Sequence, residues 1–136
     1  MEKIDLYREL SYKVVGLAMA VHSTYGSNHK EVIYQRALAE KLTLEGIEFT
    51  QEPKIVVRSL DTGKQLGWYQ PDFLIRGRMI VELKATLYPM KAHETQLRDY
   101  LKCTDIELGY LLNFGGRTLH YRRIIYTNDV KFGASV

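Results

Sequence analysis

Two carboxylates and a lysine stand close together in the stretch Gln70–Lys84, which reads QPDFLIRGRMIVELK. Apolar and polar residues alternate on both sides of Gly77, a pattern typical of a β-hairpin with one buried face. With the turn centred on Gly77, Asp72 faces Glu82 across the hairpin, and Lys84 lies on that same face. Facing carboxylates repel each other unless a hard divalent cation, which takes oxygen ligands, lies between them. The stretch therefore predicts a site for Mg²⁺ or Mn²⁺.

Two simpler explanations of this hairpin stay open. Any strand with one face in water shows the same alternation, and the spacing of Asp72, Glu82 and Lys84 also occurs by chance. A one-residue bulge at Gly77 would shift the register and separate the carboxylates. The metal site therefore depends on what the rest of the chain adds.

The composition fits one ordinary globular domain. The chain has 136 residues, of which 46% are hydrophobic, and its net charge of +3 is too small to indicate nucleic-acid binding by itself. Cys103 is the only cysteine, which excludes a disulfide or a cysteine zinc cage within one chain and favours a reducing cytoplasm. The apolar run Val14–Val21 is too short to span a bilayer, so we expect no membrane insertion.

The elements around the hairpin are predicted from periodicity and from turn residues. Apolar residues at helical spacing predict one helix between Asp5 and Gly26 and a second from about His29 to Glu45. A meander of short strands leads into the hairpin, a third helix runs from about Ala92 to Cys103, and two strands follow. We therefore predict an α/β fold of the α+β type, with a central mixed β-sheet flanked by helices. Residues 1–126 would form a single domain, and residues 127–136 a loose C-terminal tail.

Polar residues on two of these helices are candidates for the same site. Glu31 falls in the first turn of the second helix, where a favourable interaction with the helix dipole explains an acidic residue equally well. Gln96 and Tyr100 are four residues apart on the third helix and so project from one side. Residues at this spacing are also common on ordinary helix surfaces, so the helices alone do not decide the function.

The order of these parts resembles the PD-(D/E)XK nuclease superfamily, whose motif is matched by Pro71-Asp72 and by Glu82-x-Lys84. The chain is more closely similar to the GxxExxY family of small bacterial proteins, whose namesake segment falls on residues 28–34, NHKEVIY. Asn28 replaces the namesake glycine, and asparagine tolerates the positive φ that the glycine would supply. The likeness covers nearly the whole chain and implies a restriction-endonuclease-like core.

The resemblance implies a metal-dependent nuclease that hydrolyses DNA phosphodiester bonds. Asp72 and Glu82, with the backbone carbonyl of Leu83 and the Glu31 carboxylate, would hold Mg²⁺ or Mn²⁺ ions that bind a phosphate oxygen and activate a water. Lys84 would orient that water or stabilise charge on the phosphorus. DNA is the expected partner, with RNA as an open alternative, and both a monomer and a homodimer are compatible with the sequence.

Several further residues are implied to act around this centre. Gln96 would position the water, Lys84 or a phosphate, and Tyr100 would support Gln96, as in the Gln-x3-Tyr helix element of exonuclease-like branches. Tyr34, the last residue of the namesake segment, would likewise support the site from outside. Candidate contacts to the nucleic-acid backbone, which serve solubility equally well, are Arg76, Arg78, Lys91 and Arg98.

Two other functions stay open. The chain would be a catalytically idle nuclease-fold module if the same residues bind nucleic acid or metal without cleavage. It would instead hydrolyse a small phosphorylated compound if the site lies in a deep pocket. Cleavage and binding assays separate these three possibilities.

Overall fold

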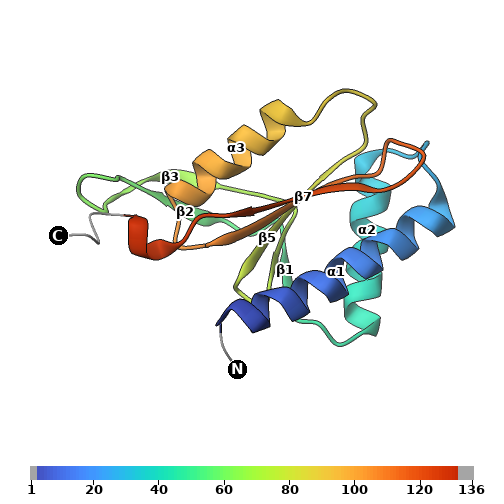
Figure 1. Cartoon of the computed structure of the whole chain (residues 1–136), viewed down its shortest axis with the longest axis horizontal. Coiled ribbons are helices and arrows are strands. Elements are labelled where there is room, and N and C mark those ends of the chain that lie inside the picture. Colours follow the sequence, from blue (N-terminus) through green and yellow to red (C-terminus); the bar gives the residue numbers. More distant parts are fainter. Residues whose placement is uncertain (1–2, 132–136) are drawn as a thin grey trace. The chain divides into compact units, whose positions relative to one another are not determined.

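The structure is a computed structural model that describes residues 3–131. The elements, in chain order, are α1 (Lys3–Tyr25), α2 (Glu31–Leu44), β1 (Phe49–Gln51), β2 (Ile55–Arg58), β3 (Gln65–Tyr69), β4 (Phe73–Ile75), β5 (Met79–Lys84), α3 (Lys91–Lys102), β6 (Leu108–Asn113), β7 (His120–Ile125) and the 3-10 helix η1 (Asn128–Val130) (Figure 1). Five strands form a mixed sheet in the order β1-β4-β5-β6-β7, and β2 and β3 form a separate two-stranded sheet. The predicted α+β class is confirmed.

The chain divides into two compact units. The first holds the residues up to Glu48 together with Leu83–Leu87 and Leu112–Tyr121, and the second holds Phe49–Glu82, Tyr88–Leu111 and the residues from Arg122 on. The predicted limits of a single domain at residues 1–126 stay a prediction. None of the helices in residues 3–131 combines the length with the apolar composition that a membrane span requires.

The first residues of the predicted tail have defined structure, and the assignment of residues 127–136 as a tail stays a prediction. Residues 128–130 form η1, and Lys131 is buried. The Lys131 ammonium donates hydrogen bonds to the carbonyl oxygens of Thr104 (3.1 Å) and Ile106 (2.7 Å). A buried ammonium group needs such acceptors to offset the loss of water. Residues 132–136 of the predicted tail lie outside the described residues.

The hairpin register expected from the alternation is confirmed. β4 and β5 pair antiparallel, with Phe73 opposite Val81, Leu74 opposite Ile80 and Ile75 opposite Met79. The apolar residues expected to face the core, Phe73, Ile75, Met79, Val81 and Leu83, are buried.

The hairpin turn explains why this register holds. Arg76 and Gly77 both have positive φ, 53° and 65°, and the Arg78 N–H donates a hydrogen bond to the Ile75 carbonyl (3.0 Å). Positive φ at these two successive residues folds the chain back tightly, and Arg78 completes a loop of three residues between the paired Ile75 and Met79. The loop is centred on Gly77, and the pairs of β4 and β5 show no register shift that would separate Asp72 from Glu82.

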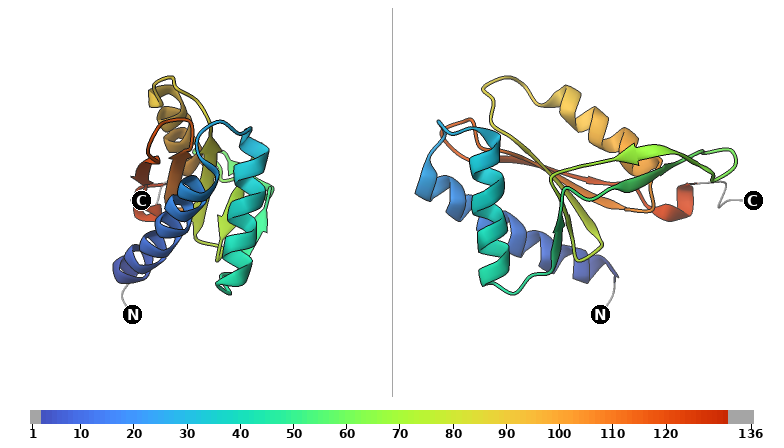
Figure 2. Two further views of the ribbon diagram at one scale, coloured as in Figure 1. Left: turned by 90° about the vertical axis from the view of Figure 1, so that its right-hand side faces the viewer. Right: turned by 180° about the vertical axis from the view of Figure 1, so that it is seen from behind.

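The second face of the hairpin is covered by α3. The sequence predicts that helices flank the sheet but does not indicate which face α3 covers. Ile80 lies on the same side of β5 as Glu82, yet it is fully buried. It shares a core cluster with residues of α3, β6 and β7, namely Leu97, Leu101, Leu111 and Ile124. The ribbon views show α3 running along the sheet (Figures 1 and 2). The face that carries Glu82 is therefore not a simple hydrated strand face.

Candidate functional site

Asp72 and Glu82 face each other beside this covered part of the sheet. One further step along the ladder from Phe73 opposite Val81 puts Asp72 opposite Glu82. The Asp72 carbonyl accepts a hydrogen bond from the Glu52 N–H (2.8 Å), which ties the residue before β4 to the chain beyond β1. Both carboxylate side chains are half-buried, so their mutual repulsion is less screened than in water. Oxygen donors arranged in this way fit a hard divalent cation.

Tyr69, at the end of β3, contacts this pair and was missed by the sequence reasoning. Its phenol donates a hydrogen bond to the Glu82 carboxylate, and the Asp72 charge also acts on it. Burial raises the pKa of the Tyr69 phenol well above its usual range, and the neighbouring carboxylate of Glu82 raises this pKa further. A phenolate here would be desolvated and would face negative charge. Tyr69 therefore remains a protonated hydrogen-bond donor at neutral pH.

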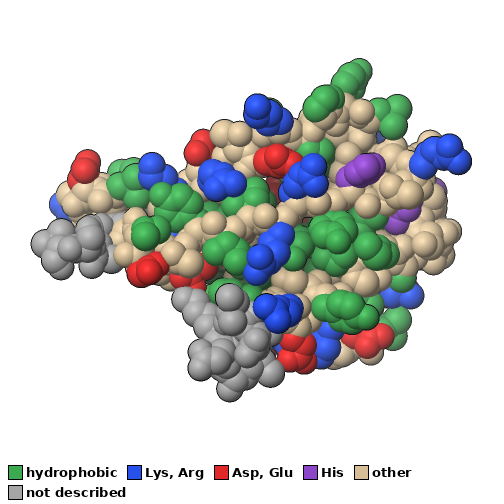
Figure 3. Space-filling view, in the orientation of Figure 1, with side chains coloured by type: hydrophobic (Ala, Val, Ile, Leu, Met, Phe, Trp, Pro, Cys, Tyr) green, Lys and Arg blue, Asp and Glu red, His purple; other side chains and the backbone are tan. Residues whose placement is uncertain are grey.

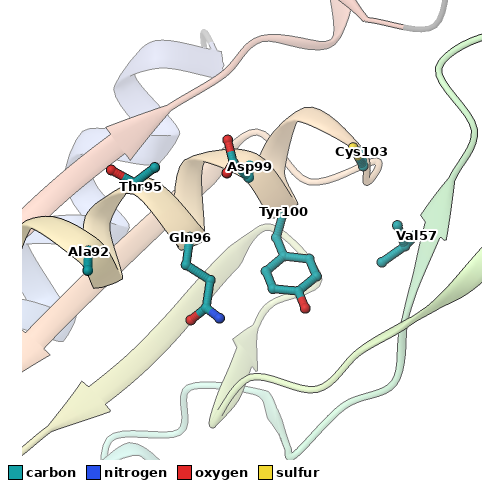
Figure 4. Close-up of a pocket in the computed structure, with 7 residues that line it drawn as sticks. All are labelled: Val57, Ala92, Thr95, Gln96, Asp99, Tyr100 and Cys103. Atoms are coloured by element: carbon teal, nitrogen blue, oxygen red, sulfur yellow. The ribbon is translucent and has the colours of Figure 1, made fainter.

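The helix α3 contributes Gln96 and Tyr100 from one side, as predicted (Figure 4). The Tyr100 ring stacks on the Tyr69 ring, with 3.8 Å between the ring centroids and 4° between the planes. Tyr100 thus contacts and supports Tyr69, whereas the sequence predicts that Tyr100 supports Gln96. Gln96 is exposed. It borders an open groove of about 470 Å³ whose lining is Val57, Ala92, Thr95, Gln96, Asp99, Tyr100 and Cys103.

Lys84 is the last residue of β5 and is half-buried. It follows Glu82 by two residues on the same strand, so both side chains leave the same face. The Lys84 carbonyl accepts a hydrogen bond from the Phe114 N–H (2.8 Å). The backbone that presents the ammonium group is therefore fixed to the end of β6.

The chain just after Lys84 is held by the side chain of Asn113. The Asn113 amide oxygen accepts hydrogen bonds from the N–H groups of Thr86 (3.1 Å) and Gly115 (3.0 Å), and its amide nitrogen donates one to the Thr86 carbonyl (2.9 Å). Gly115 passes so close to Thr86 that a Cβ atom would lie 2.3 Å from the Thr86 nitrogen. Only glycine fits this crossing without displacing the backbone after Lys84.

Tyr34 anchors the start of α2, where Glu31 lies. Its hydroxyl donates a hydrogen bond to the Gly26 carbonyl (2.6 Å) and accepts one from the His29 N–H (3.2 Å). Its ring, fully buried, stacks on Phe114 with 4.5 Å between centroids. Tyr34 thus fixes the loop before α2 and packs on Phe114, whose N–H binds the Lys84 carbonyl. Its role in supporting the site stays a prediction.

The namesake segment differs from the expectation at its first residue. Among the described residues other than glycine, positive φ occurs only at Glu52 and Arg76, so Asn28 does not take the conformation expected of it. Gly26, two residues earlier, has φ 75° and ends α1 instead, with its N–H bonded to the His22 carbonyl (2.8 Å). Glu31 is exposed in the first turn of α2, and its role as a metal ligand stays a prediction.

A family model described as the PD-(D/E)XK nuclease superfamily matches residues 8–124. The chain belongs to this superfamily. Asp72, Glu82 and Lys84 supply the residues for which the superfamily is named, in the order of its motif. The superfamily assignment made from the sequence is confirmed, and the role of these three residues as its centre stays a prediction.

Two solved structures are similar to the chain. An alkaline exonuclease (LHK-Exo) from Laribacter hongkongensis is 17% identical, with a TM-score of 0.45 over 67% of this chain and 53% of the exonuclease. SSO0001 is 20% identical, with a TM-score of 0.47 over 85% of this chain and 67% of that one. The chain thus spans about half the length of the exonuclease. No curated protein matches the chain.

The possible metal ligands of this superfamily member are few. Within residues 3–131, no group of three or more His, Cys, Asp and Glu side chains is arranged to hold a metal ion. An ion at Asp72 and Glu82 would therefore need uncharged oxygen ligands as well, such as the Leu83 carbonyl or water. Mg²⁺ commonly binds in this way, with one or two carboxylates and several retained waters.

The four basic residues considered for nucleic-acid contacts are all exposed. Arg76 and Arg78 flank Gly77 in the β4–β5 turn, and Lys91 and Arg98 lie on α3. Figure 3 shows Lys and Arg side chains scattered over the viewed face, with acidic side chains among them. Their contacts with a phosphate backbone stay predictions.

Proposed function

We propose that the chain is a metal-dependent nuclease of the GxxExxY family that hydrolyses DNA phosphodiester bonds. The observation that carries this proposal is the facing pair Asp72 and Glu82, with Lys84 two residues further along β5. The buried Tyr34, which anchors the first turn of α2 where Glu31 lies, supports the narrower family. A cytoplasmic location, and a monomer or homodimer, remain predictions from the sequence.

The proposed role of each residue follows from the chemistry of its side chain. Asp72 and Glu82, with the Leu83 carbonyl and water, would hold Mg²⁺ or Mn²⁺, which supplies positive charge and acidifies a bound water. The Lys84 ammonium would donate a hydrogen bond to the attacking water or to a phosphate oxygen that gains charge in the transition state.

Residues on α3 and in the hairpin turn would position the substrate. Gln96 is exposed beside the groove on α3, where its amide would bind a phosphate oxygen or the water. Arg76, Arg78 and Arg98, with Lys91, would contact phosphates along the strand, which adds affinity without sequence preference.

The proposal is tested by incubating highly purified protein with linear and circular DNA, single- and double-stranded, in Mg²⁺, Mn²⁺ or EDTA. We expect cleavage with either metal and none in EDTA, and circular substrates will report internal cuts. The same assays with RNA show whether the substrate is DNA or RNA. Protein that binds DNA and metal but cleaves no substrate would instead be the idle nuclease-fold module.

Millimolar Mn²⁺ is expected to raise the melting temperature of the wild type, because a cation relieves the repulsion between Asp72 and Glu82. A ligand bound only by the folded state stabilises it by about 2.7 kcal/mol at a hundredfold excess over Kd, which is roughly 10 °C for a domain of this size. Asp72→Asn should remove most of this response and leave the metal-free protein at least as stable. Scanning fluorimetry with and without Mn²⁺ measures both effects.

The matched control is Asp61→Asn, the same substitution at an exposed residue between β2 and β3. It should melt and respond to Mn²⁺ as the wild type does. A full Mn²⁺ response in Asp72→Asn would show that the cation binds elsewhere.

A further inference from the structure

Three elements meet at the Glu82 carboxylate through two tyrosines. Tyr69 comes from β3, which pairs with β2 rather than with the five-stranded sheet. Its side chain is 7% exposed, and its phenol donates a hydrogen bond to Glu82. Tyr100 comes from α3 and lies parallel to the Tyr69 ring at 3.8 Å between centroids. A buried tyrosine hydroxyl needs a hydrogen-bond partner, and here the partner is one of the two carboxylates of the site.

A hydrogen bond from a neutral donor suits a carboxylate that must bind a cation. A bond to one oxygen of Glu82 limits rotation of the carboxylate group. A phenol leaves the negative charge in place, whereas an Arg or Lys donor would offset the charge that attracts the cation. Outer partners that orient metal-binding carboxylates in this way typically change metal affinity by about 10–100-fold when they are removed.

We propose that Tyr69 is a positioning residue that orients the Glu82 carboxylate for the divalent cation, and that the Tyr100 ring holds Tyr69 in this position. This role rests on the proposed function, because it concerns the same pair of carboxylates. The β2–β3 sheet then has a part in the site through Tyr69. The two residues of the Gln-x3-Tyr spacing on α3 then have different roles. Gln96 faces the groove, and Tyr100 holds Tyr69, which binds Glu82.

The test compares Mn²⁺ binding by wild type and Tyr69→Phe. Phenylalanine keeps the ring and its stack on Tyr100 and removes only the hydroxyl. We expect the Mn²⁺ dissociation constant, measured by isothermal titration calorimetry without DNA, to rise about 10–100-fold. In cleavage assays the Mn²⁺ concentration for half-maximal rate should rise similarly, while kcat at saturating Mn²⁺ falls much less.

Two further comparisons separate positioning from general stability. Tyr110→Phe removes another buried tyrosine hydroxyl, on the face of β6 opposite to Leu111 and α3, and should leave Mn²⁺ affinity unchanged. Tyr100→Phe keeps the stack and should bind Mn²⁺ as the wild type does, whereas Tyr100→Leu loses the stack and should bind it more weakly.

Each remaining outcome overturns the role. Equal Mn²⁺ affinity in wild type and Tyr69→Phe would make Tyr69 a core residue only. Tighter binding by Tyr69→Phe would show that the phenol competes with the cation for Glu82. A wild type that binds no Mn²⁺ would overturn the proposed metal-dependent function together with this role, so the two failures are distinguishable.

Discussion

Lys84→Ala is expected to lower the rate of DNA cleavage by about 10²–10³ while the protein stays folded and keeps most of its affinity for DNA. The effect is large because the ammonium group acts on charge that develops only in the transition state, and such an interaction changes rate more than binding. Lys84 ends β5, and its backbone is fixed through Phe114. Loss of the side chain should therefore leave the strand in place. Single-turnover cleavage and DNA binding in Ca²⁺ measure the two quantities separately.

Lys91→Ala is the matched comparison, since Lys91 is an exposed lysine at the start of α3. A lysine that only contacts phosphate should lower DNA affinity and its salt dependence, with little effect on turnover. The same result for Lys84→Ala would show that Lys84 contacts phosphate and does not act in the chemical step. Glu82→Gln controls for purity, because cleavage that persists undiminished in both Glu82→Gln and Lys84→Ala would come from a contaminating nuclease.

Gly115→Ala should produce the largest loss of stability, about 3 kcal/mol, because overpacking against fixed backbone is among the more severe core changes. For a domain of this size the melting temperature would fall by roughly 10 °C. The added Cβ would lie 2.3 Å from the nitrogen and 2.5 Å from the oxygen of Thr86. The side chain of Asn113 holds those same two atoms, so they have little freedom to move away. Thermal unfolding followed by circular dichroism measures the change.

Gly16→Ala provides a control that should change stability in the opposite direction. Gly16 is exposed within α1, and no atom lies within 4 Å of the position of its added Cβ. Alanine should therefore stabilise the helix by about 1 kcal/mol, as it does in exposed helix interiors. A Gly115→Ala protein that melts like the wild type would show that the backbone at Thr86 can yield.

The sequence could predict the hairpin because its two signals agree. The two-residue alternation fixes which side chains share a face, and the Gly77 turn fixes which of them are opposite, so Asp72 and Glu82 follow. The burial of Ile80 could not be predicted in the same way. Alternation separates the two faces of one strand but does not show whether a helix from elsewhere in the chain covers the second face.

Tyr69 was missed for a related reason. Its role depends on Glu82 and Tyr100, which lie on elements that follow it in the chain, and no local pattern links the three. Tyr34 was more accessible to sequence reasoning because the resemblance singled it out, although its stack on Phe114 becomes visible only in the structure. Asn28 shows the opposite error, since its tolerance of positive φ was real but Gly26 takes that conformation.

The Asn113 side chain imitates a peptide group. It gives one hydrogen bond to Thr86 and takes one from it, as a neighbouring residue in a β-ladder would, and so it continues the pairing of the chain beyond Lys84 without a further strand. Leu87 and Tyr88, which come next, are largely exposed. Asn113 therefore holds the backbone directly after Lys84, and substitutions in the exposed segment from Leu87 to α3 should leave the position of Lys84 unchanged.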